Sequence, residues 1–207
     1  AILRLGRAAE YRDNETGMHV IRMSRLSAKL AKKIGLPDEE CQLILQASPM
    51  HDVGKIGIPD EILLKPGKLN EEEWVIMKKH SEIGAEILSG SRSAIMKMAE
   101  SIALTHQERW DGSGYPNSLK GEEIPLAGRI VAICDVFDAL TSKRYYKEAY
   151  SIEKSMGIIE QGSGKDFEPR LVEAFKEALP EMVRIVKELP DNEPADILKV
   201  YLETNTT

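Results

Sequence analysis

Residues 51–60 read HDVGKIGIPD, and this stretch decides the fold that we predict. It sets an imidazole beside a carboxylate at His51 and Asp52, and places Lys55 between two glycines. A neutral imidazole and an ionised carboxylate both bind divalent first-row metals, and a carboxylate can also bridge two such ions. Glycines beside Lys55 would let a bulky anion approach the backbone. The stretch therefore predicts a metal and phosphate site bridged by Asp52, against the plainer alternative of a buried histidine hydrogen-bonded to an aspartate.

The composition is that of a globular chain with one well-buried core. The sequence has 207 residues, of which 42% are hydrophobic and 30% charged, and we expect no membrane segment. A net charge of -6 makes duplex nucleic acid an improbable partner, although a small anion can still bind a local basic cluster. The two cysteines, Cys41 and Cys134, lie in apolar helical stretches. They are expected to be buried free thiols in a reducing, cytoplasmic environment.

All four histidines fall on the apolar stripes of amphipathic segments. These segments are expected to be helices over about 16–34, 37–51, 70–88 and 95–106. The histidines on them are His19, His51, His80 and His106. A single inward histidine is usually a hydrogen-bonded core residue, but burying four on converging helices without a common partner would be costly. A shared metal centre is the economical explanation.

A further helix, expected after Pro125 and up to about residue 141, carries two acids in an otherwise apolar segment. A solvated face would explain Asp135 and Asp138, but the surrounding apolar residues favour burial near cations. Three basic residues follow: Lys143, Arg144 and Lys147. Residues 110–116 read WDGSGYP, and two glycines and a proline in seven residues exclude a helix. They predict a turn-rich loop at the rim of the site.

We expect one domain over residues 1–190 and a polar tail over 191–207. Helices over about 151–161, 170–179 and 182–189 are expected only to pack on the rest. The tail is expected to be partly helical and either to pack on the domain or to mediate homodimer contacts. The chain opens with alanine rather than methionine, which is compatible with an upstream regulatory domain.

Four motifs carry a family resemblance. They are ETGMH at 15–19, HDVGKIGIPD at 51–60, DGSGYP at 111–116 and DVFDALT at 135–141. Together they resemble the HD superfamily of metal-dependent phosphohydrolases, and within it the HD-GYP subfamily. The resemblance implies an all-α fold, a helical bundle with a metal centre between converging helices. It also implies a phosphodiesterase that hydrolyses cyclic di-GMP to linear pGpG, GMP or both, by attack of a metal-bridging hydroxide.

The same resemblance implies roles for individual residues. The ligands to two divalent ions, iron or manganese, would be Glu15, His19, His51, Asp52, His80, His106 and Asp135. Asp52 and Lys55 would be catalytic, and the substrate contacts would be Lys55, Asp138, Arg144 and Lys147. Fixed cations of this kind neutralise charge that develops during phosphoryl transfer. The loop residues would form the rim or bind a diguanylate cyclase partner; they are Gly114, Tyr115 and Pro116.

One position departs from the family pattern. The family has two consecutive histidines where this chain has His106 followed by Gln107. Because an amide is a poorer metal ligand than an imidazole, we expect two tightly held ions and a third, recruited by Glu15, that is weak or absent. Because of Gln107, the alternative also stays open that the chain is a catalytically weak module that binds a cyclic dinucleotide or a partner. A phosphodiesterase for another cyclic dinucleotide also stays open, whereas the GYP motif and the lysines argue against a di-iron oxygenase.

Overall fold

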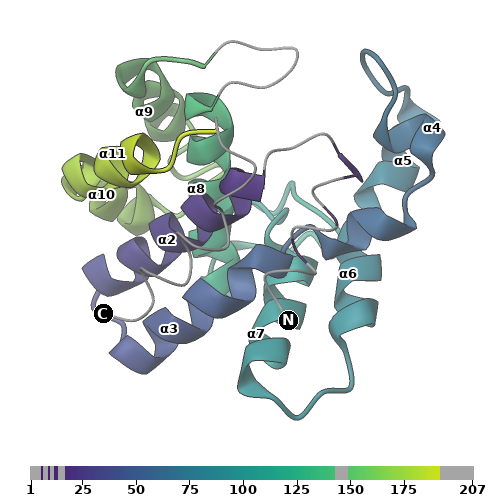
Figure 1. Ribbon diagram of the computed structural model, residues 1–207, viewed down its shortest axis with the longest axis horizontal. Helices are drawn as coiled ribbons and strands as arrows, with labels where there is room; N and C mark the ends of the chain where they lie inside the picture. The colour runs from purple at the N-terminus through teal and green to yellow at the C-terminus, as the bar shows by residue number, and fades with distance from the viewer. Residues whose placement is uncertain (1–5, 7–8, 10–11, 14–16, 143–148, 192–207) are drawn as a thin grey trace.

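The computed structural model describes Gly6, Ala9, Arg12, Asp13 and residues 17–142 and 149–191. Within these ranges the secondary structure is helical, and the only strand-like feature described is an isolated bridge between Ser163 and Phe167. The all-α fold expected from the sequence is therefore confirmed. Figure 1 shows the helices arranged around α2 and α8.

The described helices follow one another with short connections. They are α2 (Gly17–Lys33), α3 (Asp38–Ala47), α4 (Asp60–Leu63), α5 (Glu71–Lys78), α6 (His80–Leu88), α7 (Ala94–Thr105), α8 (Leu126–Thr141), α9 (Ile152–Gln161), α10 (Pro169–Glu177) and α11 (Leu179–Glu188). Three 3₁₀ turns join them: η1 (Ser48–Met50), η2 (Val53–Gly57) and η3 (Gly121–Glu123). Helix α2 contacts α3 and α8, and α7 contacts α3, α6 and α8. These contacts make one continuous helical body.

The main core lies against α2 and α8. Met23, Leu26 and Leu30 of α2 are fully buried, because spacings of three and four put them on one face of the helix. Phe137 of α8 packs edge-on against Phe175 of α10, with ring centroids 4.9 Å apart. Helices α9, α10 and α11 gather on one side of the molecule (Figure 1), so the last three described helices cover this core.

Helices α4 and α5 lie on the opposite side of the molecule from α9, α10 and α11 (Figure 1). They form a smaller apolar cluster, whose buried members are Ile58, Ile62 and Leu63. Helix α5 begins with a capping box, in which Asn70 and Glu73 each accept a hydrogen bond of 2.8 Å from the other's backbone N–H. Two orphan donors at the helix start are thereby satisfied. The helix start expected at about residue 70 is confirmed.

Two predicted helices differ from the structure where they carry histidines. The helix expected to run to His51 ends at Ala47, because Pro49 has no N–H to continue the hydrogen-bond ladder and begins a 3₁₀ turn instead. The helix expected over 70–88 is divided at Lys79 into α5 and α6. Both breaks place the histidine at a helix boundary rather than in mid-helix.

Between the helices expected over 37–51 and 70–88, residues 60–63 form α4, which was not predicted from the sequence. Asp60 and Glu61 in the first turn favour a helix there, because their negative charges interact favourably with the positive end of the helix dipole. The predicted buried free thiols, Cys41 and Cys134, are confirmed. Among the described helices, none combines the length and the apolar character that crossing a membrane requires. The predicted tail helix lies in residues 192–207, outside the described part of the chain.

Candidate metal centre

Six candidate ligands from five segments meet in the interior. His19 comes from α2, His51 and Asp52 from the turn between η1 and η2, His80 from the start of α6, His106 from the end of α7, and Asp135 from α8. They form two groups, and within each group the ligand atoms lie within 4.8 Å of one another. The first ligand group is His19, His51 and Asp135, and the second ligand group is Asp52, His80 and His106.

The second ligand group is buried throughout. Oδ1 of Asp52 lies 3.3 Å from Nε2 of His80 and 3.3 Å from Nε2 of His106. Within the described residues, none of these three atoms has a hydrogen-bond partner, although all are buried. An orphaned buried polar atom costs free energy, so three that face one another call for a common partner. A divalent cation would satisfy all three at once.

The first ligand group lies on the other side of the Asp52 carboxylate. Oδ1 of Asp135 lies 3.4 Å from Nε2 of His19 and 4.0 Å from Nε2 of His51. Nε2 of His51 is also 3.3 Å from Oδ2 of Asp52. The two oxygens of Asp52 therefore face different ligand groups. This is the placement that a bridging carboxylate requires.

Every histidine of the centre presents Nε2 because its Nδ1 is occupied. Nδ1 of His51, His80 and His106 lies 2.8–3.1 Å from backbone carbonyl oxygens three or four residues earlier in the chain. Nδ1 of His19 instead lies 2.8 Å from Oδ2 of Asp138. Such outer partners fix the tautomer in which Nε2 carries the lone pair that binds metal. The donor set and its orientation thus fit two divalent ions.

Burial and charge shift the pKa values of these groups. Burial lowers the pKa of His51, but Asp52 and Asp135 raise it by more, to about 9. Burial raises the pKa of Asp52, but Lys55 and His51 hold it well below its ordinary value. Burial lowers the pKa of His80 to about 4 despite the nearby Asp52. His80 is therefore a neutral imidazole at pH 7, whereas an ion that binds His51 must displace a proton.

Two glycines let the ligand-bearing segments approach closely. A side chain on Gly54 would overlap the carbonyl oxygen of His80, so the turn that carries Asp52 rests directly on the backbone of α6. A side chain on Gly128 would overlap the hydroxyl of Thr105, next to His106, where α8 crosses the end of α7. Glycine at these two positions keeps the ligand groups together.

Lys55 lies beside the carboxylate of Asp52. Its Nζ is 2.8 Å from Oδ2 of Asp52 and 2.5 Å from Oδ2 of Asp13. Arg12 contacts the same turn, with Nη2 donating to the carbonyl of Ile58 at 3.0 Å and to Oδ1 of Asp60 at 2.5 Å. Sequence reasoning missed Arg12 and Asp13, because nothing in their short polar stretch indicates a contact with residues 51–60. Their proximity to HDVGKIGIPD depends on the fold.

Asp138 differs from its expected role as a substrate contact. Its side chain is fully buried, and its oxygens accept hydrogen bonds from His19 and from the Arg22 guanidinium. No face of this carboxylate is open to a phosphate, which it would also repel. Its position beneath His19 corrects the prediction and makes Asp138 an orienting residue for the first ligand group.

The GYP loop forms a rim beside the second ligand group. The ring of Tyr115 lies edge-on to His80 at 6.1 Å and to Trp74 at 6.2 Å, measured between ring centroids. Lys78 places its Nζ 5.9 Å from the Tyr115 ring centroid. Burial, with the charge of Asp52, raises the pKa of the Tyr115 phenol, which stays protonated. Aromatic surface thus extends outward from His80 to Trp74, whose side chain is 46% exposed.

A buried carboxylate organises this loop. Glu108 accepts hydrogen bonds from the backbone N–H of Asn117 at 2.7 Å and of Leu119 at 3.1 Å. The backbone of Gly114 lies so close to Glu108 that a side chain there would clash. The peptide bond between Tyr115 and Pro116 is cis. Glu108 was not selected from the sequence, although its place between His106 and the GYP motif was a usable signal.

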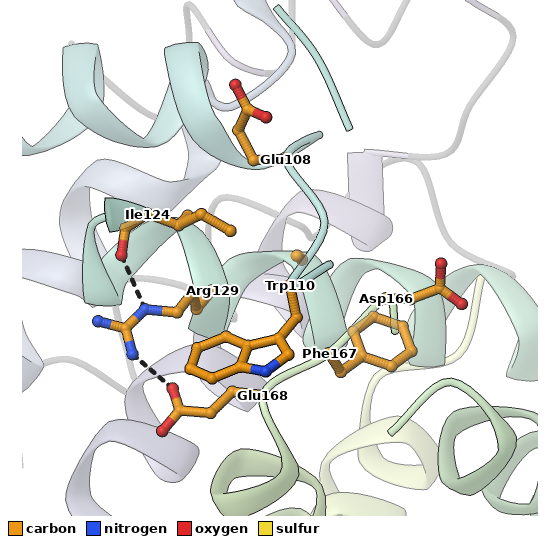
Figure 2. A pocket seen from close by; sticks show the side chains of 8 residues that line it. Glu108, Trp110, Ile124, Arg129, Asp166, Phe167 and Glu168 are labelled. Atoms are coloured by element: carbon orange, nitrogen blue, oxygen red, sulfur yellow. Dashed lines mark hydrogen bonds and ion pairs between the residues drawn. The ribbon is translucent and has the colours of Figure 1, made fainter. Parts of the chain in front are cut away.

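Figure 2 shows how the base of the loop is held. Arg129 donates to the carbonyl of Ile124 at 2.8 Å and to Oε2 of Glu168 at 2.6 Å. Its guanidinium lies 5.8 Å from the ring centroid of Trp110, within range of a cation–π contact. The cavity between these side chains measures about 10 Å³, room for roughly one water. This site is a structural brace rather than a ligand pocket.

Three predicted site residues lie outside the described part of the chain: Glu15, Arg144 and Lys147. Gln107 is half-buried, and its backbone carbonyl accepts a hydrogen bond of 3.2 Å from the N–H of Tyr115. The predicted effect of its side chain on a third ion stays a prediction. The structure therefore brings together six of the seven predicted ligands, with Lys55 beside them.

The chain matches the HD domain family over residues 5–171. It is 50% identical over 190 residues to the 3'3'-cGAMP-specific phosphodiesterase 2 of Vibrio cholerae, covering 92% of this chain and 36% of that protein. It is 51% identical over 172 residues to the cyclic di-GMP phosphodiesterase response regulator RpfG of Xanthomonas campestris, covering 83% of this chain and 46% of that protein. The chain thus spans less than half of either relative.

Solved structures share the fold. A cyclic GMP-AMP specific phosphodiesterase of V. cholerae aligns with a TM-score of 0.65 at 20% identity, over 91% of this chain and 54% of the other. The HD domain of the Listeria monocytogenes phosphodiesterase PgpH aligns with a TM-score of 0.57 at 17% identity, over 89% of this chain and 97% of the other. At these identities the likeness concerns the fold alone. With the family match and the close relatives above, it leads to one conclusion: this chain belongs to the HD domain family and, by its motifs, to the HD-GYP group.

Proposed function

We propose that this chain is a metal-dependent phosphodiesterase that hydrolyses a cyclic dinucleotide, with cyclic di-GMP as the expected substrate and pGpG, GMP or both as products. The observation that carries the proposal is the position of Asp52, whose two oxygens face two ligand groups of buried donors. Paired divalent ions in such a centre activate a water and polarise a phosphoryl oxygen. Close relatives with phosphodiesterase names support this reading.

The protein's own groups supply the remaining requirements. Lys55 is a fixed cation beside Asp52, placed to neutralise charge that develops on a phosphoryl group bound there. Asp135 is partly exposed, with 22% of its side chain accessible, so the first ligand group has an open side toward solvent. The other ligands are buried and exclude competing water. These features favour chemistry over binding alone, because a pure binding module has no need for a partly buried cation at the bridging carboxylate.

We also propose that the rim contacts the nucleobases. Trp74 and Tyr115 offer aromatic surface that continues outward from His80. Stacking of a base on an aromatic ring contributes about 1–3 kcal/mol and tolerates different bases. Such a surface does not discriminate guanine from adenine, and relatives of near-equal identity are named for cyclic di-GMP and for 3'3'-cGAMP. Hydrolysis of a hybrid cyclic dinucleotide is therefore the second candidate.

The ions proposed are iron or manganese, since imidazole and carboxylate donors suit both. Two are held by the two ligand groups, and a third, dependent on Glu15, is weak or absent. The free thiols of Cys41 and Cys134 support a reducing, cytoplasmic setting. We also propose that a diguanylate cyclase domain binds at the GYP loop and that the chain forms a homodimer.

One experiment tests these proposals together. The protein is purified without oxygen, its metal content is measured, and it is incubated with cyclic di-GMP, 3'3'-cGAMP and cyclic di-AMP while linear products are separated by chromatography. We expect about two ions per chain and linear product from cyclic di-GMP. If metal-loaded protein binds cyclic di-GMP but forms no product, the chain is a binding module rather than an enzyme. If product forms from 3'3'-cGAMP alone, the proposed substrate is wrong but the proposed phosphodiester hydrolysis stands.

A further inference from the structure

Arg22 is a charged residue buried beneath the first ligand group. It follows His19 by three residues on α2, so both side chains lie on the same helix face. Only 2% of its surface is exposed, although arginine is rarely so buried without partners. The nearby carboxylates of Asp138 and Asp191 outweigh the effect of burial and raise the pKa of Arg22, which stays charged. This guanidinium has no part in the proposed chemistry, so its burial needs another reason.

One end of the guanidinium holds the partner of a metal ligand. Nε of Arg22 donates to Oδ1 of Asp138 at 2.6 Å, and Nη2 donates to Oδ2 at 3.1 Å. This two-pronged contact fixes the plane of the carboxylate. The same Oδ2 lies 2.8 Å from Nδ1 of His19, whose Nε2 faces Asp135 at 3.4 Å. The orientation of His19 therefore depends on Arg22 through Asp138.

The other end reaches the chain just after α11. Nη1 of Arg22 donates to the carbonyl of Leu189 at 2.9 Å and to Oδ1 of Asp191 at 2.8 Å. Nη2 also donates to the hydroxyl of Ser142 at 2.8 Å. A guanidinium has five N–H donors, and the contacts to Asp138, Leu189, Asp191 and Ser142 use all of them. Leu189 is buried against α2, which keeps this end in place.

We infer that Arg22 is a positioning residue for the first ligand group, and that the segment Leu189–Asp191 is the remote end of the same device. This inference rests on the proposed metal centre. Displacing residues 189–191 frees two of the guanidinium's contacts, lets Asp138 turn and releases Nδ1 of His19. The segment that follows the last described helix thereby controls how firmly one ion is held, over a sequence separation of 169 residues. The second ligand group has no contact with this network among the described residues, so it is expected to be unaffected.

The test uses Arg22→Lys and Asp191→Asn in the full chain. Lysine keeps the charge but loses the two-pronged geometry, and Asp191→Asn weakens only the remote end. Lys29→Met is the matched control, because Lys29 joins α2 to Glu181 of α11 through an exposed ion pair 3.5 Å long that does not involve Asp138. Mn²⁺ is titrated into each metal-free protein by calorimetry. We expect Arg22→Lys to weaken one of two Mn²⁺ sites by about 10–100-fold, Asp191→Asn to weaken the same site less, and Lys29→Met to change neither.

A second readout needs no metal. In the metal-free protein, the Nδ1 proton of His19 is followed by NMR, since its hydrogen bond to buried Asp138 protects it from exchange. We expect this resonance in the parent chain and in Lys29→Met, and its broadening or loss in Arg22→Lys and Asp191→Asn. An unchanged resonance in both variants, or an equal weakening of both Mn²⁺ sites, would overturn the inference. If the parent chain binds no Mn²⁺ but shows the Arg22-dependent resonance, the proposed function is wrong. The role of Arg22 in orienting His19 is then still supported.

Discussion

The two ligand groups are held in place by different means. In the second ligand group, Nδ1 of His80 and of His106 contacts a carbonyl oxygen within three or four residues of the same histidine. In the first ligand group, His19 is held by Asp138, which is 119 residues away in sequence. The second group is therefore oriented by local helix ends. In the first group His51 is also held locally, by the carbonyl of Ser48, whereas His19 depends on how α2, α8 and the chain after α11 pack together.

The difference teaches where the centre is robust and where it can be adjusted. A local anchor forms whenever its helix ends correctly, so the second ligand group is insensitive to distant changes. A long-range anchor fails when any of its packed segments shifts. Asp52 connects the two ligand groups, because one of its oxygens faces the first group and the other faces the second.

The largest effect is expected from Asp52→Ala, which removes the carboxylate shared by both groups. We expect product formation to fall below detection and bound metal to drop to less than one ion per chain, while helical content stays near that of the parent. Metal analysis, circular dichroism and the product assay measure the three quantities. Asp38→Ala is the control, because that carboxylate is exposed at the start of α3. Parent-like metal content in Asp52→Ala would refute the bridging role.

Lys55→Ala removes the cation beside Asp52 without removing a ligand. If Lys55 acts on charge that develops in the transition state, kcat should fall by about 10²–10³ while metal content and KM change little. Lys65→Ala, which breaks an exposed ion pair with Glu73, is the matched control and should leave kcat unchanged. A rise in KM with kcat preserved would make Lys55 a binding residue only.

The comparison of the two groups also explains how far sequence could predict the site. Helical spacing indicated that the four histidines and Asp135 face inward, and Asp52 was found because it adjoins His51. Local contacts of Nδ1 keep His51, His80 and His106 in place. Asp138 was placed wrongly as a substrate contact, since the residue that buries it, Arg22, lies 116 positions away. The extent of α8 was predicted well from its apolar pattern. The helix breaks before His51 and His80 were not predicted. A buried histidine continues the apolar stripe of the sequence whether it lies at a helix end or within a helix, so the stripe does not reveal the break.

A pH experiment separates the two groups without mutating a ligand of the second. In the metal-free protein the pKa of His51 is about 9, above its ordinary value of 6.5, so its stabilising charge is present below pH 6.5 and lost as pH rises through 9. The pKa of His80 is about 4, so His80 stays neutral across this window. We expect the melting temperature of the metal-free protein to fall by several degrees between pH 6.5 and 9.

Mn²⁺ should reverse this trend, because at higher pH it displaces less proton from His51 and so stabilises the protein more. Calorimetric melting curves with and without Mn²⁺ across the pH window measure both effects. His51→Gln is the control and should flatten the pH dependence of the metal-free protein. A slope that survives in His51→Gln would assign the titration to another group.

The smallest effect is expected from Gln107→His, which asks whether the two groups are the whole centre. Gln107 is half-buried next to His106, and its backbone already holds Tyr115, so a histidine there changes the side chain without moving the loop anchor. An imidazole binds a divalent ion better than an amide does. We expect retention of a third ion under chelator challenge to rise a few-fold while the two tightly held ions are unaffected. Gln107→Asn, which keeps the amide, is the control, and metal retained after timed exposure to chelator is the measurement. Three tightly held ions in the parent chain, or equal retention in both variants, would show that Gln107 does not limit the centre and that the two ligand groups alone decide how many ions are held.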